Sequence, residues 1–111
     1  TVGKNRYVKL NQPDLYVQSR KMDLMYSSRA EVLDYLIARD DVYIEETKNG
    51  KITKTATSQN ARFDNRDNLI VLTQFPQVYQ DKNTVTGDKI IINRDTDLIE
   101  VEESNAFSKG K

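Results

Sequence analysis

The chain has 111 residues, of which 37% are hydrophobic and 31% charged, which fits one domain with a thin core and a large solvated surface. Its 17 Lys and Arg residues balance 17 Asp and Glu residues, so no net field attracts nucleic acid or an anionic membrane surface. Cys and His are both absent, which excludes disulfides, thiolate zinc sites and every Ser/His or Cys/His nucleophile arrangement.

Apolar and polar residues alternate with period two along most of the chain, a pattern that predicts β-strands. A helix over residues 27–38 is the main alternative to an all-β fold, because Val32, Leu33, Leu36 and Ile37 have nearly helical spacing. The strands expected from the pattern, in chain order, are 6–10, 15–26, 32–38, 42–47, 51–57, 61–64, 69–73, 77–80, 84–86, 89–93 and 98–102.

Turn residues separate several of these strands. Asn49-Gly50 predicts a tight type I′ hairpin, because both residues tolerate the positive φ that this turn requires. Pro13 lies in a predicted turn, and Pro76 should end or bend the strand before it. No run of about 18 apolar residues occurs and the first residues do not form a signal segment, so we expect a processed chain or one that never carried a signal.

Two segments 29 positions apart are similar, namely 64–72 and 93–101. Each is a polar turn followed by a strand that begins Leu-Ile, and residues 59–63 match 88–92 at the same offset. A fainter first copy begins at Ser19 and reaches Tyr43, if its turn near residues 27–30 contains additional residues. Repeats of this length predict stacked rungs of β-strand, because one rung cannot bury its own apolar edge. Chance similarity among alternating β sequences is the alternative.

The segments 55–61, 64–73, 83–90 and 97–101 together resemble the LptA/OstA-like family of periplasmic lipopolysaccharide-transport domains. Their order matches the family's rung, and the resemblance extends over about residues 16–107. Residues 74–77, Gln-Phe-Pro-Gln, depart from the Gly-Asn turn that the family often has after its leucine strand, so we expect the local bend to differ.

The resemblance implies an all-β, elongated and twisted β-jelly-roll, folded like a taco, located in the periplasm. It implies an apolar interior that receives the acyl chains of lipid A, and head-to-tail joining of such domains between the inner and outer membranes. We expect a single domain over residues 1–111, in which residues 1–14 form a tail or an edge strand. We expect no cofactor and no enzymatic activity.

Strand alternation predicts which side chains line the interior. If Glu100 and Glu102 point outward, Ile99 and Val101 point inward. The repeat and the same alternation place five further residues beside them: Phe63, Ile70, Leu72, Ile90 and Ile92. Additional candidates, whose register depends on the assumed insertion in the first copy, are Met22, Leu24, Val42, Ile44, Val78 and Val85. A closed core filled by these same side chains is the alternative.

A stack of strands leaves unpaired backbone groups at its two ends, which invites the strand of another chain. Because the two ends differ, such contacts do not close and would produce filaments. The expected interface residues at the two ends are Tyr7, Val8, Leu10, Leu98, Ile99, Glu100 and Val101. Crowding by the terminal segments is the alternative.

These observations favour a lipopolysaccharide-binding transport module that shields acyl chains and docks with partner domains. The alternative function is a structural or adhesive β-repeat module with a closed core and protein partners only. Acidic and amide side chains recur at turns, from Asp64 to Asp97, but they are standard turn formers and lack calcium-loop spacing. The six Tyr residues could stack on sugars or bases, although half-buried strand positions explain them more simply.

Overall fold

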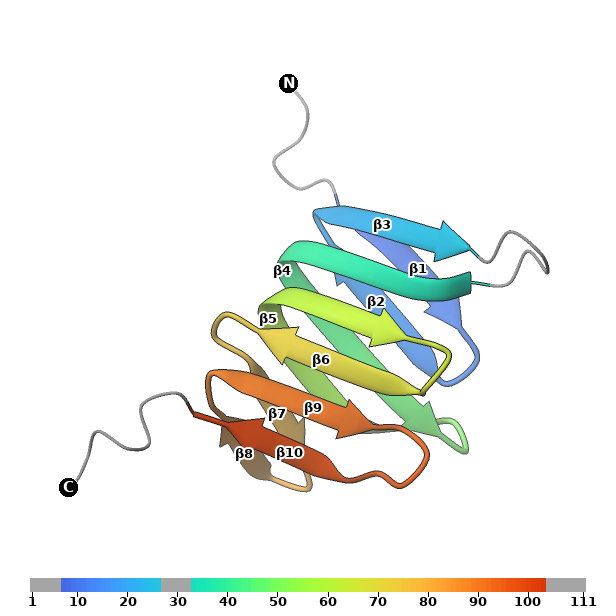
Figure 1. Cartoon of the computed structure of the whole chain (residues 1–111). Helices are drawn as coiled ribbons and strands as arrows, with labels where there is room; N and C mark the ends of the chain where they lie inside the picture. Colours follow the sequence, from blue (N-terminus) through green and yellow to red (C-terminus); the bar gives the residue numbers. More distant parts are fainter. Residues whose placement is uncertain (1–6, 27–32, 104–111) are drawn as a thin grey trace.

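The computed structural model describes residues 7–26 and 33–103, and this part of the chain is all-β without a helix. Residues 33–38, considered above as helical, lie in a strand, and residues 27–32 lie outside the described residues. The strands are β1 (Val8–Gln12), β2 (Leu15–Ser19), β3 (Lys21–Tyr26), β4 (Leu33–Lys48), β5 (Lys51–Asp64), β6 (Leu69–Thr73), β7 (Gln77–Gln80), β8 (Asn83–Thr86), β9 (Lys89–Asn93) and β10 (Ile99–Glu102) (Figure 1).

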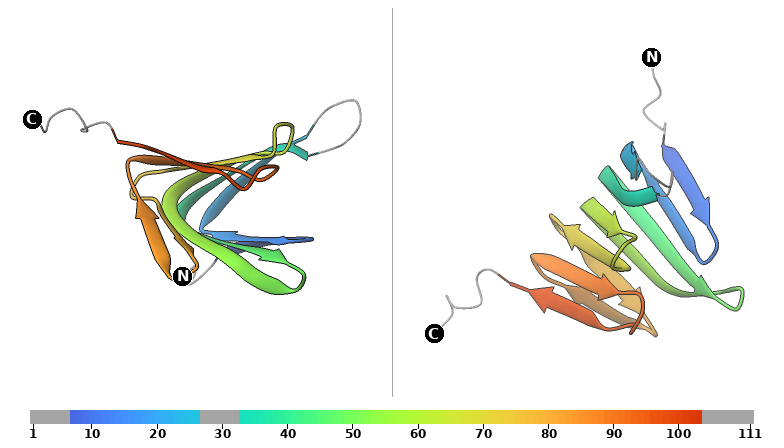
Figure 2. Two further views of the ribbon diagram at one scale, coloured as in Figure 1. Left: turned by 90° about the horizontal axis from the view of Figure 1, so that it is seen from below. Right: turned by 45° about the vertical axis from the view of Figure 1, so that its right-hand side comes forward.

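The strands form one antiparallel sheet that is folded into two facing leaves (Figure 1; Figure 2, left). The front leaf contains β3, the first half of β4, the second half of β5, and then β6, β9 and β10. The back leaf contains β1, β2, the second half of β4, the first half of β5, and then β7 and β8. The expected jelly-roll of stacked antiparallel strands is therefore confirmed, and the two long strands β4 and β5 belong to both leaves.

The chain bends from one leaf to the other at positions where the sequence pattern predicted gaps between strands. In β4, Asp40 and Asp41 have positive φ angles of 68° and 59°, and the register with β5 shifts between Arg39 and Val42. The chain passes between leaves again at Gln74 and Phe75, with φ of 63° and 61°. The separate strands predicted at 32–38 and 42–47, and at 51–57 and 61–64, were wrong, because each pair is one strand that bends.

The bend also divides a strand that we expected to be continuous. The predicted strand 15–26 is two strands, β2 and β3, which lie in opposite leaves on either side of Arg20. The backbone N–H of Arg20 donates to the carbonyl of Asp40 at 3.0 Å, and its guanidinium contacts the Asp41 carboxylate at 3.0 Å. These contacts join the crossing point of β2 and β3 to the bend in β4.

The sequence repeat corresponds to a repeated turn. The side chain of Asp64 accepts hydrogen bonds from the backbone N–H groups two and three residues later, and Asn93 does the same 29 positions on. Asn68 and Asp97 then both take positive φ, 56° and 65°, before β6 and β10 begin. The same turn therefore starts both strands, as the repeat predicted.

Other local predictions have mixed outcomes. Asn49 and Gly50 have φ of 56° and 79° between β4 and β5, which fits the predicted hairpin. The first strand was predicted two residues too early, since β1 begins at Val8 and ends at Gln12. The last strand begins at Ile99, so Leu98 precedes it and is largely exposed.

Candidate functional site

The inner face of the front leaf is a continuous set of apolar side chains. Directly opposite residues in an antiparallel pair point to the same side of the sheet, so the ladder registers identify this face. One row passes from Leu24 on β3 through Leu36, Phe63, Ile70 and Ile92 to Ile99 on β10. A second, parallel row consists of Met22, Ala38, Ala61, Leu72, Ile90 and Val101.

The back leaf contributes the opposing wall. Its main row passes from Leu10 on β1 through Val17, Ile44, Ala56 and Val78 to Val85 on β8. Val42 lies on the same face of β4, two residues from Ile44 and nearer the bend. The two walls pack against each other as one hydrophobic core between the leaves.

The structure brings the predicted lining residues together on these inner faces. Eight of them are buried in the core: Phe63, Ile70, Leu72, Ile90, Ile92, Val42, Ile44 and Val78. Met22, Val85 and Ile99 are partly buried and pack against that core. Their role in lipid binding stays a prediction.

Leu24 and Val101 share the inner face but are 42% and 41% exposed. Among the described residues, each lies on a strand with one ladder partner, β3 on β4 and β10 on β9, and no further described strand covers it. The apolar inner face is therefore accessible at both ends of the stack.

Sequence reasoning missed other buried residues of the interior. Leu36 and Ala38 were obscured by the helical spacing around them, although strand alternation would have identified them. The alternation of Leu15, Val17 and Ser19 was a clear signal for the inner face of β2 that remained unused. Ala56 and Ala61 are small residues that gave no hydrophobic signal, yet both are buried.

The interior is tightly packed in its middle rungs. Val17, Ala38, Leu72, Val78 and Ile90 have no exposed surface. A ligand that entered between the leaves there would have to displace these contacts, which would require the leaves to separate.

A group of charged side chains crosses between the leaves on the side opposite the bend. Glu46 on β4 faces Lys54 on β5, with Oε1 and Nζ 3.2 Å apart, and their side chains are 7% and 3% exposed. From the loop between β9 and β10, Arg94 contacts Glu46 at 3.4 Å and Asp97 contacts Lys54 at 2.9 Å. Asp97 also pairs with Lys48 at the end of β4, at 2.5 Å. We call these five residues the charged bridge.

The charged bridge shifts the pKa values of two of its members. Burial lowers the pKa of Lys54, but its hydrogen bond to Asp97 and its attraction to Glu46 outweigh this, so the pKa is raised overall. Hydrogen bonds from Lys48 and then Lys54 lower the pKa of Asp97 to about 2. Both groups are therefore ionised at neutral pH, and the bridge consists of charge-assisted contacts.

The outer face of the back leaf combines tyrosines with amide and acidic side chains. Tyr16 donates its hydroxyl hydrogen to Gln18 at 2.8 Å, and Tyr43 donates to Glu45 at 2.7 Å. The hydrogen bond to Glu45, and then burial, raise the pKa of Tyr43 to about 12. A hollow of about 530 Å³ lies over these residues.

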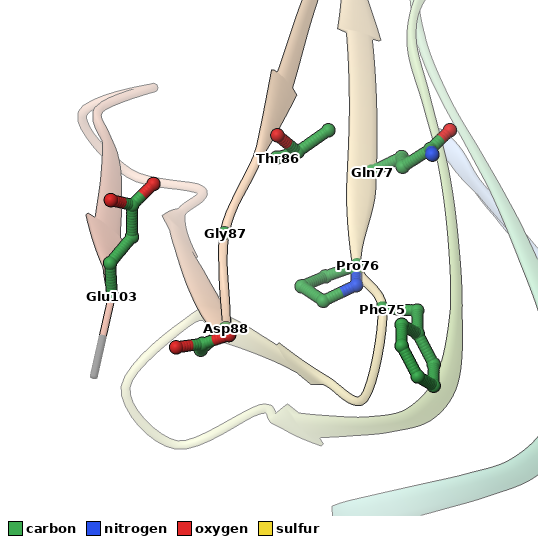
Figure 3. Close-up of a pocket in the computed structure, with 7 residues that line it drawn as sticks. All are labelled: Phe75, Pro76, Gln77, Thr86, Gly87, Asp88 and Glu103. Atoms are coloured by element: carbon green, nitrogen blue, oxygen red, sulfur yellow. The ribbon is translucent and has the colours of Figure 1, made fainter. Parts of the chain in front are cut away.

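A second hollow lies at the bend, where the chain passes between the leaves. Phe75 is 85% exposed there, whereas the adjoining Pro76 is buried. Figure 3 shows both residues where β7 begins, with Gly87 between β8 and β9 and Glu103 beyond β10.

Several of the acidic side chains considered as calcium ligands have structural partners instead. Asp64 caps its own turn, and Asp95 accepts a hydrogen bond from Asn68 at 2.7 Å. Among the residues that the structure describes, no group of three or more acidic, His or Cys side chains could hold a metal ion. Within the same residues, no helix is long and apolar enough to span a membrane.

Comparisons with known proteins agree with this architecture. The sequence model of the family described as LptA/(LptD N-terminal domain) LPS transport protein matches residues 7–98. The fold is similar to the crystal structure of LptH from Pseudomonas aeruginosa, described as the LptA homologous periplasmic component of the lipopolysaccharide transport device. The TM-score is 0.77 at 14% identity, over 93% of this chain and 71% of that chain. A search of the curated proteins finds no match.

Proposed function

This chain belongs to the family of LptA and LptD N-terminal domain lipopolysaccharide-transport proteins, and from that premise we propose that its interior shelters the acyl chains of lipid A in the periplasm. The observation that carries the proposal is the apolar inner face that passes through every rung and is accessible at both terminal strands.

The energetics favour an apolar ligand over a polar one. Removing an acyl chain from water stabilises the complex by about 0.8 kcal/mol per methylene, which must exceed the cost of parting the two walls. The exposed inner side chains at the ends, Leu24 on β3 and Val101 on β10, offer contact surface before any wall separates. We therefore expect acyl chains to enter from a terminal rung.

Photo-crosslinking tests which face of the sheet meets the lipid. A photoreactive residue at Ile92 or Val101 should form adducts with lipopolysaccharide. The matched controls are the next residues toward the other face, Ile91 and Glu100, which pair with each other on the outside of β9 and β10. Equal labelling from both faces, or no adduct from either inner position, would contradict the proposal.

We further propose that the domain docks head to tail with similar domains. In the part of the chain that the structure describes, each end of the stack presents two strands with a single ladder partner: β1 and β3 at one end, β8 and β10 at the other. The sequence predicted only the β1 and β10 edges, because β3 was hidden inside a longer expected strand. An incoming domain that paired with both edges would continue the two leaves and the apolar interior between them.

Leu24 and Met25 provide a matched test of docking, because they are adjacent on β3, 42% and 44% exposed, and point to opposite faces. Leu24→Asp puts a charge on the inner face and should abolish concentration-dependent assembly in light scattering. Met25→Asp puts the same charge outside and should leave assembly unchanged. If both variants assemble as the parent does, the inner edge is not the docking surface.

The packed middle rungs favour a second candidate, a structural or adhesive module whose core stays closed. In that case added lipopolysaccharide leaves the unfolding temperature unchanged, because only a ligand of the native state raises it. A rise with lipid concentration, lost in Val101→Asp, would instead support the carrier.

A further inference from the structure

The charged bridge occupies a particular layer of the interior. Along the inner face of β4 the residues from the bend outward are Val42, Ile44 and Glu46, and Lys54 faces Glu46 on β5. The apolar layer therefore lies nearer the bend, and the charged layer lies over it on the open side. The open side is visible in Figure 2, left, where the leaves diverge away from the bends.

The bridge joins the two leaves physically. Lys48, Glu46 and Lys54 lie on back-leaf segments of β4 and β5, whereas Arg94 and Asp97 lie in the loop that connects β9 and β10 of the front leaf. Asp97 is central, because its two carboxylate oxygens contact lysines of two different strands. The leaves cannot separate at this position while these contacts persist.

The closed bridge is unbalanced in charge. Its buried carboxylate, that of Glu46, is held by Lys54 at 3.2 Å and by Arg94 at 3.4 Å. Three cationic side chains face only two carboxylates, so the bridge carries one excess positive charge. An additional anion is therefore attracted to it.

Asp97 is the member of the bridge that an anion can replace. Its side chain is 41% exposed, and Lys48 is 50% exposed, so both are reachable from the open side. A phosphate monoester carries up to two negative charges and three acceptor oxygens, against one charge and two oxygens for the carboxylate. The phosphate group can contact Lys48 and Lys54 as Asp97 does, but, unlike Asp97, it is not part of the front leaf.

We propose that the charged bridge is a latch across the open side of the interior, which a phosphate monoester opens by replacing Asp97 between Lys48 and Lys54. With Asp97 displaced, the loop between β9 and β10 loses two of the three ion pairs that the structure describes between it and the back leaf. The third, between Arg94 and Glu46 at 3.4 Å, must then also break for the leaves to part. The inference rests on the proposed function, since a phosphate-bearing lipid headgroup would then unlock the compartment that receives its own acyl chains.

Distance measurements test the latch without any lipid. The chain contains no Cys, so spin labels can be placed at Lys51→Cys in the β4–β5 hairpin and Arg66→Cys in the β5–β6 turn, one on each leaf. Pulsed electron paramagnetic resonance should give a single distance between the two spin labels when Asp97 is unchanged and no ligand is present. A second, longer distance should appear after addition of glucose 1-phosphate. Asp97→Asn should show the longer component without ligand. Asn tolerates the positive φ at this position, so the backbone of the loop is preserved.

Matched variants separate the latch from a general loss of loop structure. Asp95→Asn lies in the same loop, and its partner Asn68 is in the same leaf, so the distance should not change. Lys48→Gln should weaken the response to glucose 1-phosphate several-fold. Glucose without phosphate should have no effect, and inorganic phosphate should act as the sugar phosphate does. If glucose 1-phosphate leaves the distance unchanged, the latch is wrong.

Measuring lipid uptake distinguishes the carrier function from the latch. It also shows whether the phosphate group that opens the latch can be the one on the lipid. Adducts from Ile92 should form several-fold faster in Asp97→Asn than in the parent, and dephosphorylated lipid A should react more slowly than the phosphorylated form in the parent only. Absence of adducts from every inner position would overturn the carrier function alone. If adducts form at a rate that changes neither with Asp97→Asn nor with removal of the lipid phosphate, the latch is overturned and the carrier function stands.

Discussion

Gly87 approaches Val101 so closely that a Cβ atom on Gly87 would overlap Cγ1 of the valine. Gly87 connects β8 of the back leaf to β9 of the front leaf (Figure 3). Val101 lies on β10. The close approach lets β10 cover the crossing point, where the N–H of Asp88 donates to the carbonyl of Glu102 at 3.0 Å.

Gly87→Ala should therefore destabilise the fold by about 1–3 kcal/mol, as overpacking does elsewhere. Chemical denaturation measures this loss. Adding Val101→Ala should recover part of it, because the overlapping methyl group is removed. Gly50→Ala is the control: nothing lies within 4 Å of its added Cβ, so only its positive φ is strained and Val101→Ala should give no recovery. If the double variant loses as much unfolding free energy as the two single variants together, the contact between Gly87 and Val101 is contradicted.

Lys54→Met should cost about 3–5 kcal/mol of unfolding free energy, because it leaves Glu46 buried with its main partner removed. Lys51→Met, on the same strand but exposed, should change stability by less than about 0.5 kcal/mol. Urea denaturation of both variants gives the comparison. Equal stability of Lys54→Met and the parent would mean that the buried ion pair contributes nothing net.

Ile90→Ala and Val101→Ala distinguish sealed from open parts of the interior, since these residues face each other on β9 and β10. Ile90 has no exposed surface, so its truncation should cost about 2–5 kcal/mol. Val101 is 41% exposed, and its truncation should cost less than about 1 kcal/mol. Similar losses in thermal unfolding would indicate that the β10 end is covered in solution.

The lowered pKa of Asp97 makes part of the stability pH-dependent. A carboxyl whose folded pKa lies below its ordinary value of 3.8 stabilises the fold above that value, and the contribution is lost as the pH falls toward about 2. The parent should therefore be more stable than Asp97→Asn at neutral pH, and the difference should shrink between about pH 4 and pH 2. Denaturation at several pH values measures it, and a constant difference would contradict the ion pairs.

Tyr43 should ionise with a pKa of about 12, because its hydroxyl donates to Glu45 and is partly buried. Glu45→Gln removes the neighbouring negative charge and should lower this pKa. Ultraviolet titration at the phenolate band, compared with a Tyr43→Phe variant, isolates the transition. A titration near the ordinary value of 10.0 in the parent would show that the hydrogen bond is absent.

The sequence predicted the family, the all-β class and most of the inner face, because period-two alternation and a repeated turn are local signals. Phe63, Ile90, Ile92, Ile99 and Val101 share the inner face because their strands keep the register that the 29-residue repeat implied. Predicting their shared face required no information about the tertiary fold beyond the stacking of rungs.

The bend was not predictable in the same way. Asp40, Asp41, Gln74 and Phe75 take positive φ without a glycine, so the usual signal for such backbone is missing. Strands β4 and β5 were consequently divided, and β2 and β3 were joined. The charged bridge was missed because Glu46 and Lys54 look like ordinary surface residues in the sequence, and their burial depends on a loop more than forty positions away.

The long strands β4 and β5 run through both leaves and pair with each other on either side of the bend. Opening the molecule therefore cannot involve slippage of one leaf along the other, because that would break this shared pair of strands. The remaining motion is rotation about the crease, which leaves every backbone pairing intact. Amide hydrogens along β4 and β5 should consequently exchange slowly in the open and the closed forms alike, even while the side chains between the walls change their neighbours.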